Sequence, residues 1–163
     1  MKKQELSGSL RTIIALAGRM AREFGHSYVG TEHLLLAISE QEGGAGRVLR
    51  ETGLEKDCLR PMVLAGSGLG SRTLFLPQGL TPRARRAVRQ AGIEATRLHA
   101  PGIAPEHLLL ALTRDDGCTA CRILQESGTE PDCIFTETYQ TLCAQEQAQQ
   151  GRQTSVRLLE QYC

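Results

Sequence analysis

The chain has 163 residues, of which 40% are hydrophobic and 4% are aromatic, and none is tryptophan. This length allows one domain, or two small fused halves around a shared core of Leu, Ile, Val and Ala, a composition that suits packed helices better than sheets. The formal net charge of +1 gives no argument for nucleic-acid binding. No apolar run approaches the ~18 residues of a membrane span or follows the N-terminus as in a signal peptide, so we expect a soluble cytoplasmic protein.

The first half of the chain predicts four helices. Between Leu10 and Ala21, apolar residues recur at spacings of three and four, which is the stripe of an amphipathic helix. Gly25 ends this helix, and Gly53 is a predicted C-terminal cap of the third. The expected helices are carried by residues 10–21, 31–38, 45–51 and 55–64.

The second half repeats this order. Thr81 followed by Pro82 is a strong helix start, because a hydroxyl cap precedes a proline at the first helical position. Gly92 lies within this helix at the position equivalent to Gly18, and a glycine at both places predicts close helix crossing there. Four helices are expected here. The first covers residues 84–95, the second begins at Pro105, the third covers residues 120–126, and the fourth runs from about residue 130 past Cys143.

Two sequence blocks occur twice. Residues 30–38 (GTEHLLLAI) return as residues 104–112 (APEHLLLAL), 74 positions later (104 − 30), and residues 47–53 return as residues 122–128, 75 positions later (122 − 47). Two blocks that recur with offsets differing by only one residue indicate a duplicated unit. We therefore predict an all-α fold of two tandem four-helix repeats related by a pseudo-twofold axis. The expected organisation is a first repeat over residues 1–65, a Gly-rich connector over 66–79, a second repeat over 80–145, and a linker over 146–163.

This paired pattern resembles the double Clp-N (Clp repeat) domain at the N-terminus of ClpA/ClpC-type AAA+ unfoldases. The resemblance covers roughly residues 6–143, and its most specific carriers are residues 25–36 (GHSYVGTEHLLL), 81–84 (TPRA) and 106–110 (EHLLL). Residues 154–163 resemble the linker that enters the first ATPase module of such proteins. We therefore expect a fragment of a longer unfoldase, with a standalone Clp-repeat accessory protein of the Clp protease as the alternative.

The resemblance implies a recognition domain that is not itself an enzyme. Such domains dock adaptor proteins and receive substrate polypeptides, which a partner Clp peptidase of the parent protein degrades. We expect no cofactor, metal, membrane or nucleic-acid partner for this fragment, and a monomer in isolation. In some ClpC-type members the domain also reads phosphoarginine, through a hydroxyl residue opening the first helix of each repeat and the Glu of the Glu-His motif. The matching positions here are Ser7 with Glu32, and Thr81 with Glu106.

The chemistry of these residues fits such a ligand. A helix N-terminus offers unpaired N–H groups and a favourable dipole to a phosphate, and a carboxylate matches the planar donors of a guanidinium. The alternative for Glu32 and Glu106 is a first-turn position that serves the helix dipole alone. We expect the neighbouring His33 and His107 to be partly buried, hydrogen-bonded structural residues.

The chain departs from the family pattern at two places. The aromatic-Thr opening of the first repeat is Leu6–Ser7, and the Gly30–Thr31 pair becomes Ala104–Pro105 in the second repeat. Pro105 lacks a backbone donor and a hydroxyl. If a phosphate site needs those groups, the second site is impaired.

Two other functions are weighed against this one. A metal or redox protein would use the CxxC motif and its neighbours, but no second pair stands at zinc-site spacing and reduced apolar thiols are the expectation. A nucleic-acid protein would use an arginine cluster, which lacks interleaved aromatics and is expected to be a solvated face or an adaptor-docking surface. The residues concerned are Cys118, Cys121, Cys133 and Cys143 for the first, and Arg83, Arg85, Arg86 and Arg89 for the second.

Overall fold

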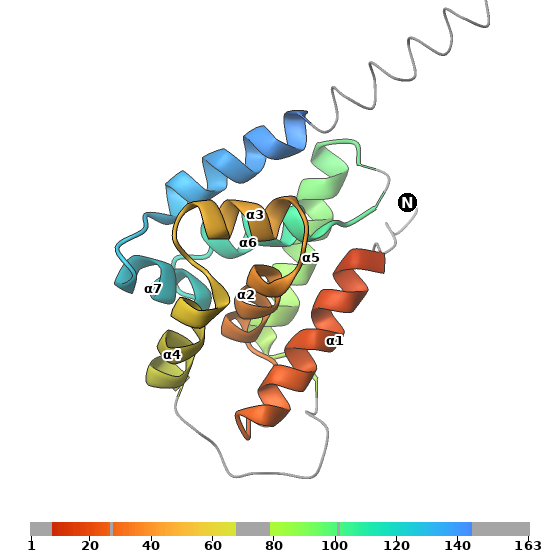
Figure 1. The fold of residues 1–163 in the computed structure, drawn as a ribbon. Coiled ribbons are helices and arrows are strands. Elements are labelled where there is room, and N and C mark those ends of the chain that lie inside the picture. The colour runs from red at the N-terminus through yellow and green to blue at the C-terminus, as the bar shows by residue number, and fades with distance from the viewer. Residues whose placement is uncertain (1–7, 27, 68–78, 101, 145–163) are drawn as a thin grey trace, which may run out of the picture.

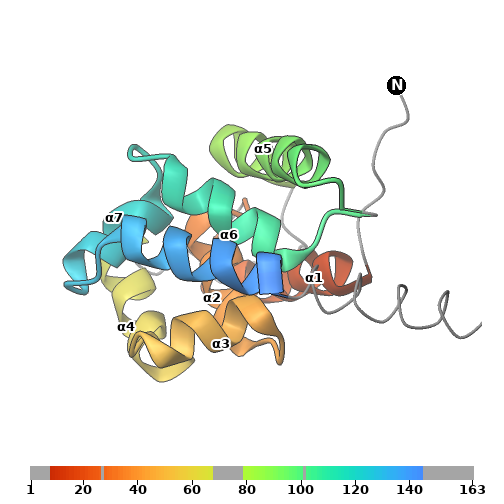
Figure 2. The same cartoon turned by 90° about the horizontal axis from the view of Figure 1, so that it is seen from above.

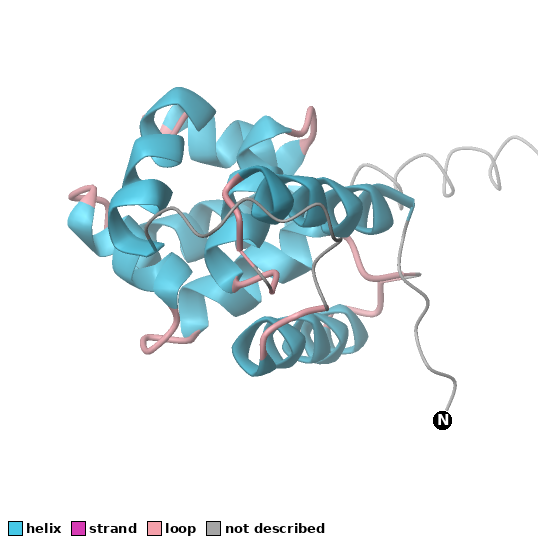
Figure 3. Ribbon diagram, turned by 90° about the horizontal axis from the view of Figure 1, so that it is seen from below, coloured by secondary structure: helices cyan, strands magenta, loops and turns pink. Residues whose placement is uncertain are grey.

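The computed structural model describes residues 8–26, 28–67, 79–100 and 102–144. Within these ranges the chain forms eight helices and no strand beyond one isolated β-bridge (Figure 1). Figure 3 shows the helices joined by short loops. The predicted all-α fold of two four-helix repeats is confirmed.

The helices follow one another in the predicted order. In the first repeat they are α1 (Gly8–Glu23), α2 (Thr31–Glu40), α3 (Gly44–Glu51) and α4 (Lys56–Ser67). In the second they are α5 (Pro82–Arg97), α6 (Pro105–Arg114), α7 (Thr119–Glu126) and a helix over residues 131–144, here called the last helix. The fourth helix is longer than expected, because α4 continues three residues past the predicted end at residue 64.

The short helices α3 and α7 end in the same way. Gly53 and Gly128 follow them at equivalent positions, and both have φ of 85°, a conformation that glycine adopts without a steric cost. The predicted cap at Gly53 is therefore confirmed. At the end of α5 the corresponding left-handed residue is His99, with φ of 54°, where the first repeat has Gly25.

The core is built around α2 and α6, which the other helices surround (Figure 2). In α6 every residue from Pro105 to Thr113 is buried, and in α2 every residue from Thr31 to Ser39 except Glu32 is buried. Helices that are apolar on all sides need neighbours on all sides. The largest fully buried side chains are mostly leucines, as the composition predicts, and include Leu34, Leu35, Leu36, Leu108, Leu109 and Leu110.

A parallel β-bridge between Val29 and Leu80 joins the two repeats. The Val29 amide donates to the Gly79 carbonyl at 2.8 Å, and the Thr81 amide donates to the Val29 carbonyl at 2.8 Å. The bridge therefore fixes the start of α5, in the second repeat, beside the segment that enters α2, in the first.

The mid-helix glycines do not mark close crossings as predicted. A Cβ at Gly18 would meet no atom within 4 Å, so the prediction is wrong there, and at Gly92 it would meet only the flexible end of Ile103 at 3.3 Å. The tight position is Gly46 in α3. A Cβ there would overlap the Gln41 carbonyl oxygen and approach the Ile38 carbonyl oxygen to 2.9 Å, because α3 packs on the end of α2.

We expect Gly46→Ala to lower the free energy of unfolding by about 1–3 kcal/mol, because backbone atoms would have to move. Gly18→Ala is the matched control and should raise it by about 0.5–1 kcal/mol, since alanine fits the open space and favours the helix. Urea unfolding of both variants measures the difference. Equal effects of the same sign would contradict this packing.

Candidate functional site

Thr81 forms the predicted N-cap of α5. Its Oγ1 accepts a hydrogen bond from the Ala84 amide at 3.1 Å, and Pro82 occupies the first helical position. Through the β-bridge, the backbone of Thr81 is bonded to Val29, three residues before Glu32. The structure thus brings Thr81 of the second repeat to the start of α2 in the first repeat.

The structure places Glu106, the predicted partner of Thr81, toward the other end of α5. Ile103, just before α6, packs against Gly92 of α5, so the start of α6 lies beside the second half of α5. Glu94 is 13 residues beyond Thr81 (94 − 81), which is about 20 Å of helix. Ser7, the remaining candidate, lies outside the described residues.

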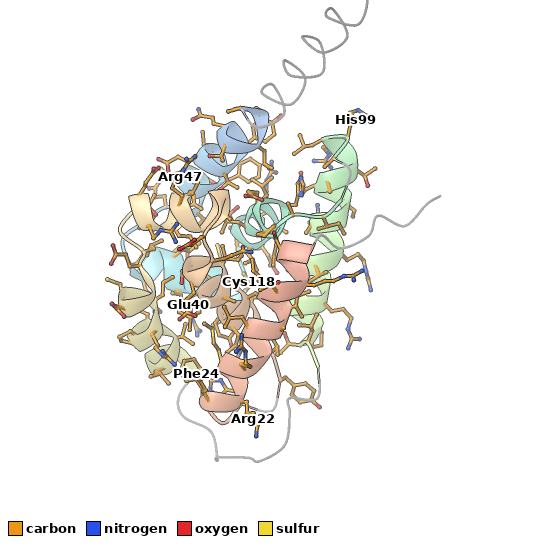
Figure 4. The ribbon with its side chains drawn as sticks, turned by 45° about the vertical axis from the view of Figure 1, so that its right-hand side comes forward. Arg22, Phe24, Glu40, Arg47, His99 and Cys118 are labelled. Carbon is orange, nitrogen blue, oxygen red and sulfur yellow. The ribbon has the colours of Figure 1, made fainter. Side chains whose placement is uncertain are left out.

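Figure 4 gives the same picture. His99, just past the C-terminal end of α5, lies at the opposite end of the molecule from Phe24, at the end of α1. The Phe24 ring lies 6.1 Å from the His33 ring at the start of α2. The two helix starts that carry Glu32 and Glu106 therefore face opposite ends of the domain.

Glu32 lies over the backbone of Gly30. Its Oε1 is 2.6 Å from the point that a Cβ on Gly30 would occupy, and its side chain keeps 13% exposure. In the second repeat the equivalent residue is Ala104, whose methyl fills this space, and Glu106 is buried where Glu32 is only partly buried. The two glutamates are therefore held differently, and Glu32 is the more accessible.

His33 caps its own helix from inside. Its Nδ1 accepts the Gly30 amide at 2.9 Å, so a neutral ring carries its proton on Nε2, which donates to Nδ1 of His26 at 2.7 Å. Burial first, and the neighbouring His26 second, lower the pKa of His33 from 6.5 to about 4. The 3.6 Å contact of its Nδ1 with Glu32 is therefore not an ion pair at neutral pH.

His107 makes the equivalent cap, with Nδ1 accepting the Ala104 amide at 2.9 Å. Burial lowers its pKa, while Glu106 and Glu94 act to raise it. Both histidines are thus buried, hydrogen-bonded structural residues, as predicted. Their electrostatic surroundings differ, because His33 contacts the imidazole of His26 while two carboxylates act to raise the pKa of His107.

The Thr31 hydroxyl has a structural role. It accepts a hydrogen bond from the Ala120 amide at 3.1 Å, and Thr31 is 2% exposed. This contact ties the start of α7 to the start of α2 across 89 residues. The hydroxyl that Pro105 lacks thus corresponds to an internal bond in the first repeat. No local sequence signal pointed to this contact.

Cys118 and Cys121 are buried thiols in the first turn of α7. The Cys118 sulfur caps the helix by accepting the Cys121 amide at 3.3 Å. Burial raises the pKa of Cys118 and raises that of Cys121 to about 11, so both are protonated at neutral pH. Among the described residues, no group of three or more His, Cys, Asp or Glu side chains could hold a metal ion, which leaves the metal alternative without a ligand set there.

The arginines of α5 lie on its exposed face. Arg85, Arg86 and Arg89 are exposed, and Arg83 contacts Asp115 at 3.3 Å. The opposite face of α5 is buried and consists mainly of alanines. In the part of the chain that the structure describes, no helix is long and apolar enough to cross a bilayer.

The chain thus contains a duplicated four-helix unit in which each buried central helix begins with a Glu-His pair. This combination is characteristic of one class of protein domain. The profile of the Clp repeat (R) N-terminal domain matches residues 1–60 and 79–161, so the chain belongs to this family. It is 38% identical over 126 residues to the chloroplastic chaperone proteins ClpC1 of Oryza sativa subsp. japonica and ClpC of Pisum sativum. The match covers 77% of this chain and 14% of each relative, so the chain spans about a seventh of their length.

Solved structures share the fold. The N-terminal domain of ClpD from Arabidopsis thaliana matches with a TM-score of 0.71 and 21% identity, covering 87% of this chain and 97% of that one. The Hsp104 N-terminal domain from Candida albicans matches with a TM-score of 0.68 and 19% identity, covering 83% and 89%. The named ClpC relatives are chloroplastic proteins, so the cytoplasmic location expected from the sequence is not theirs.

The lowered pKa of His33 predicts a loss of stability in acid. The unfolded chain binds a proton near pH 6.5 and the folded chain only near pH 4, so the free energy of unfolding falls as the pH drops between these values. We expect His33 to account for about 2.5 kcal/mol of the loss between pH 7.5 and 4.5.

Urea unfolding at the two pH values measures this loss. His33→Asn keeps an acceptor for the Gly30 amide and should make the loss smaller by that amount. His99→Asn alters an exposed histidine and should leave it unchanged. An equal loss in wild type and His33→Asn would contradict the assignment.

Proposed function

We propose that this chain is the substrate- and adaptor-recognition domain at the N-terminus of an ATP-dependent Clp unfoldase, the component that delivers proteins to a Clp peptidase. Membership of the Clp repeat family and the similarity to ClpC chaperones support this proposal. A standalone accessory protein of the Clp protease is the second candidate. The observation that supports the recognition role is that the Thr81 cap of α5 is bonded to Val29, three residues before Glu32, and we infer a composite site of Thr81 and Glu32 at this junction of the two repeats.

The composite site suits a ligand that carries an anion and a cation close together. The start of α5 offers the positive end of the helix dipole and the Thr81 hydroxyl to a phosphate. The Glu32 carboxylate, at the neighbouring start of α2, offers two oxygens to a guanidinium. Tyr28 adjoins the bridge residue Val29 and is 49% exposed. Phosphoarginine combines these two charges in one side chain.

Titration of free phosphoarginine against the isolated chain tests this site. We expect Glu32→Gln to weaken binding about tenfold or more, because a charge-assisted hydrogen bond is lost. Thr81→Asp should also abolish binding, since aspartate still caps the helix but repels a phosphate. Thr81→Asn is its neutral control and keeps the cap. Unchanged affinity in Glu32→Gln and in the Glu32→Ala/Glu106→Ala double variant would rule out these carboxylates.

The wider role has its own test. The isolated chain should bind a cognate adaptor or a tagged substrate of the Clp system in a pull-down with purified components, and it should bind no nucleotide. ATP hydrolysis by these 163 residues would contradict a recognition domain. A Walker motif encoded after Cys163 would favour the unfoldase over the standalone protein.

A further inference from the structure

The outward face of α5 carries a line of cationic side chains. Positions 86, 89, 93 and 97 are spaced three and four residues apart, so they lie along one side of the helix, opposite its buried alanines. Figure 2 shows α5 at one edge of the molecule. The four positions are all exposed, and they are here called the arginine stripe: Arg86, Arg89, Ile93 and Arg97.

Two arginines of the stripe have no partner within the part of the chain that the structure describes. No carboxylate there forms an ion pair with Arg86 or Arg89, whereas Arg97 contacts Glu94 at 3.5 Å. Arg86 and Arg89 are one turn apart, and like charges at this spacing repel each other. A carboxylate from outside would relieve this repulsion and could pair with a guanidinium through two hydrogen bonds.

Ile93 gives the stripe an apolar centre. It is 47% exposed, and among the described residues no other large aliphatic side chain is exposed. It lies four residues from Arg89 and four residues from Arg97, between their guanidinium groups. A face that only meets water gains nothing from an isoleucine, whereas a docked segment would bury apolar surface against it.

The first repeat has no such stripe. The equivalent positions on α1 lie 74 residues earlier (86 − 12, 89 − 15, 93 − 19, 97 − 23) and are also exposed. They hold Thr12, Ala15, Arg19 and Glu23, so one positive and one negative charge replace the three positive charges of the stripe. The stripe is therefore a property of the second repeat and does not follow from the duplicated fold.

The charges elsewhere in the second repeat limit what the stripe can bind. Residues 115–137 contain six acidic residues and one arginine, and the whole chain has a net charge of only +1. A long polyanion such as nucleic acid would meet these acidic residues, and the stripe has no aromatic ring on which a base could stack. A short anion avoids both difficulties. The 11 residues from Arg86 to Arg97 (97 − 86) span about 16 Å of helix, which is the length of about five extended residues.

We propose that the arginine stripe docks a short acidic segment of a partner polypeptide, with carboxylates on Arg86 and Arg89 and an apolar side chain on Ile93. That this segment belongs to a substrate or an adaptor rests on the proposed function, whereas the preference for an acidic peptide does not. The stripe is separate from the Thr81–Glu32 site, whose proposed ligand carries a phosphate and a guanidinium.

Titration of the whole 163-residue chain with the peptide acetyl-Glu-Glu-Leu-Glu-Glu-amide, followed by NMR of the Ile93 methyl groups and the α5 amides, tests the proposal. We expect saturable shifts that weaken as salt is added, and none with the lysine counterpart acetyl-Lys-Lys-Leu-Lys-Lys-amide. A thymidine pentanucleotide carries the same four negative charges and should bind more weakly, because it offers no aliphatic side chain to Ile93. No saturable shift with the acidic peptide, or equal or tighter binding of the pentanucleotide, would overturn the proposal.

Three variants separate docking on the stripe from a general attraction of charges. The double variant Arg86→Glu/Arg89→Glu should bind the acidic peptide at least tenfold more weakly. Arg19→Glu makes the same change of charge at an exposed position of α1 and should leave binding unchanged. Ile93→Ser, measured from the α5 amides, should weaken binding about threefold, a loss that charge alone would not give.

Equal binding by wild type and the double variant would overturn the assignment of the stripe. Its failure and that of the proposed function are distinguishable. A chain that binds the acidic peptide but no adaptor or substrate of the Clp system would count against the proposed function and leave the stripe standing.

Discussion

The burial of α2 and α6 on almost every side is the constraint on which the rest of this structure depends. A helix without a solvated face cannot leave its first amides to water, so the polar groups at its start need partners inside the fold. His33 and His107 meet this need by turning back to the amides of residues 30 and 104. Thr31 goes further and caps another helix. The start of each central helix is consequently hydrogen-bonded inside the fold.

The pseudo-twofold axis has a consequence for recognition. Because the β-bridge pairs Val29 with Leu80, the first helix of the second repeat begins at the central helix of the first. The proposed composite site of Thr81 and Glu32 therefore needs both repeats, and one repeat alone would supply either the hydroxyl-capped helix start or the carboxylate. Duplication is in this sense part of the proposed site, since it brings a helix start and an acidic residue together from different copies.

The sequence predicts what local signals determine. Helix order, the Thr81 cap, the Gly53 cap and the structural role of the two histidines follow from periodicity and short-range chemistry. The pairing of Thr81 with Glu32 depends on how the repeats dock, as does the bond from Ala120 to Thr31, and neither leaves a local trace. The prediction of a close helix crossing at Gly18 was wrong, because a glycine within a helix does not reveal whether another helix lies close to it. Glu94 drew no attention, because one acidic residue in a helix is ordinary until its burial is known.

The two repeats keep one scaffold while their charges differ. The leucines of α2 and α6 pack alike, whereas the ends of α1 and α5 carry Met20, Glu23 and His26 in one copy and Glu94, Arg97 and Ala100 in the other. The polar residues of each set have partners nearby. His26 contacts His33, and Glu94 contacts Arg97 and Gln90. The two copies of a duplicated fold therefore share their packing and differ in the charged groups beside it.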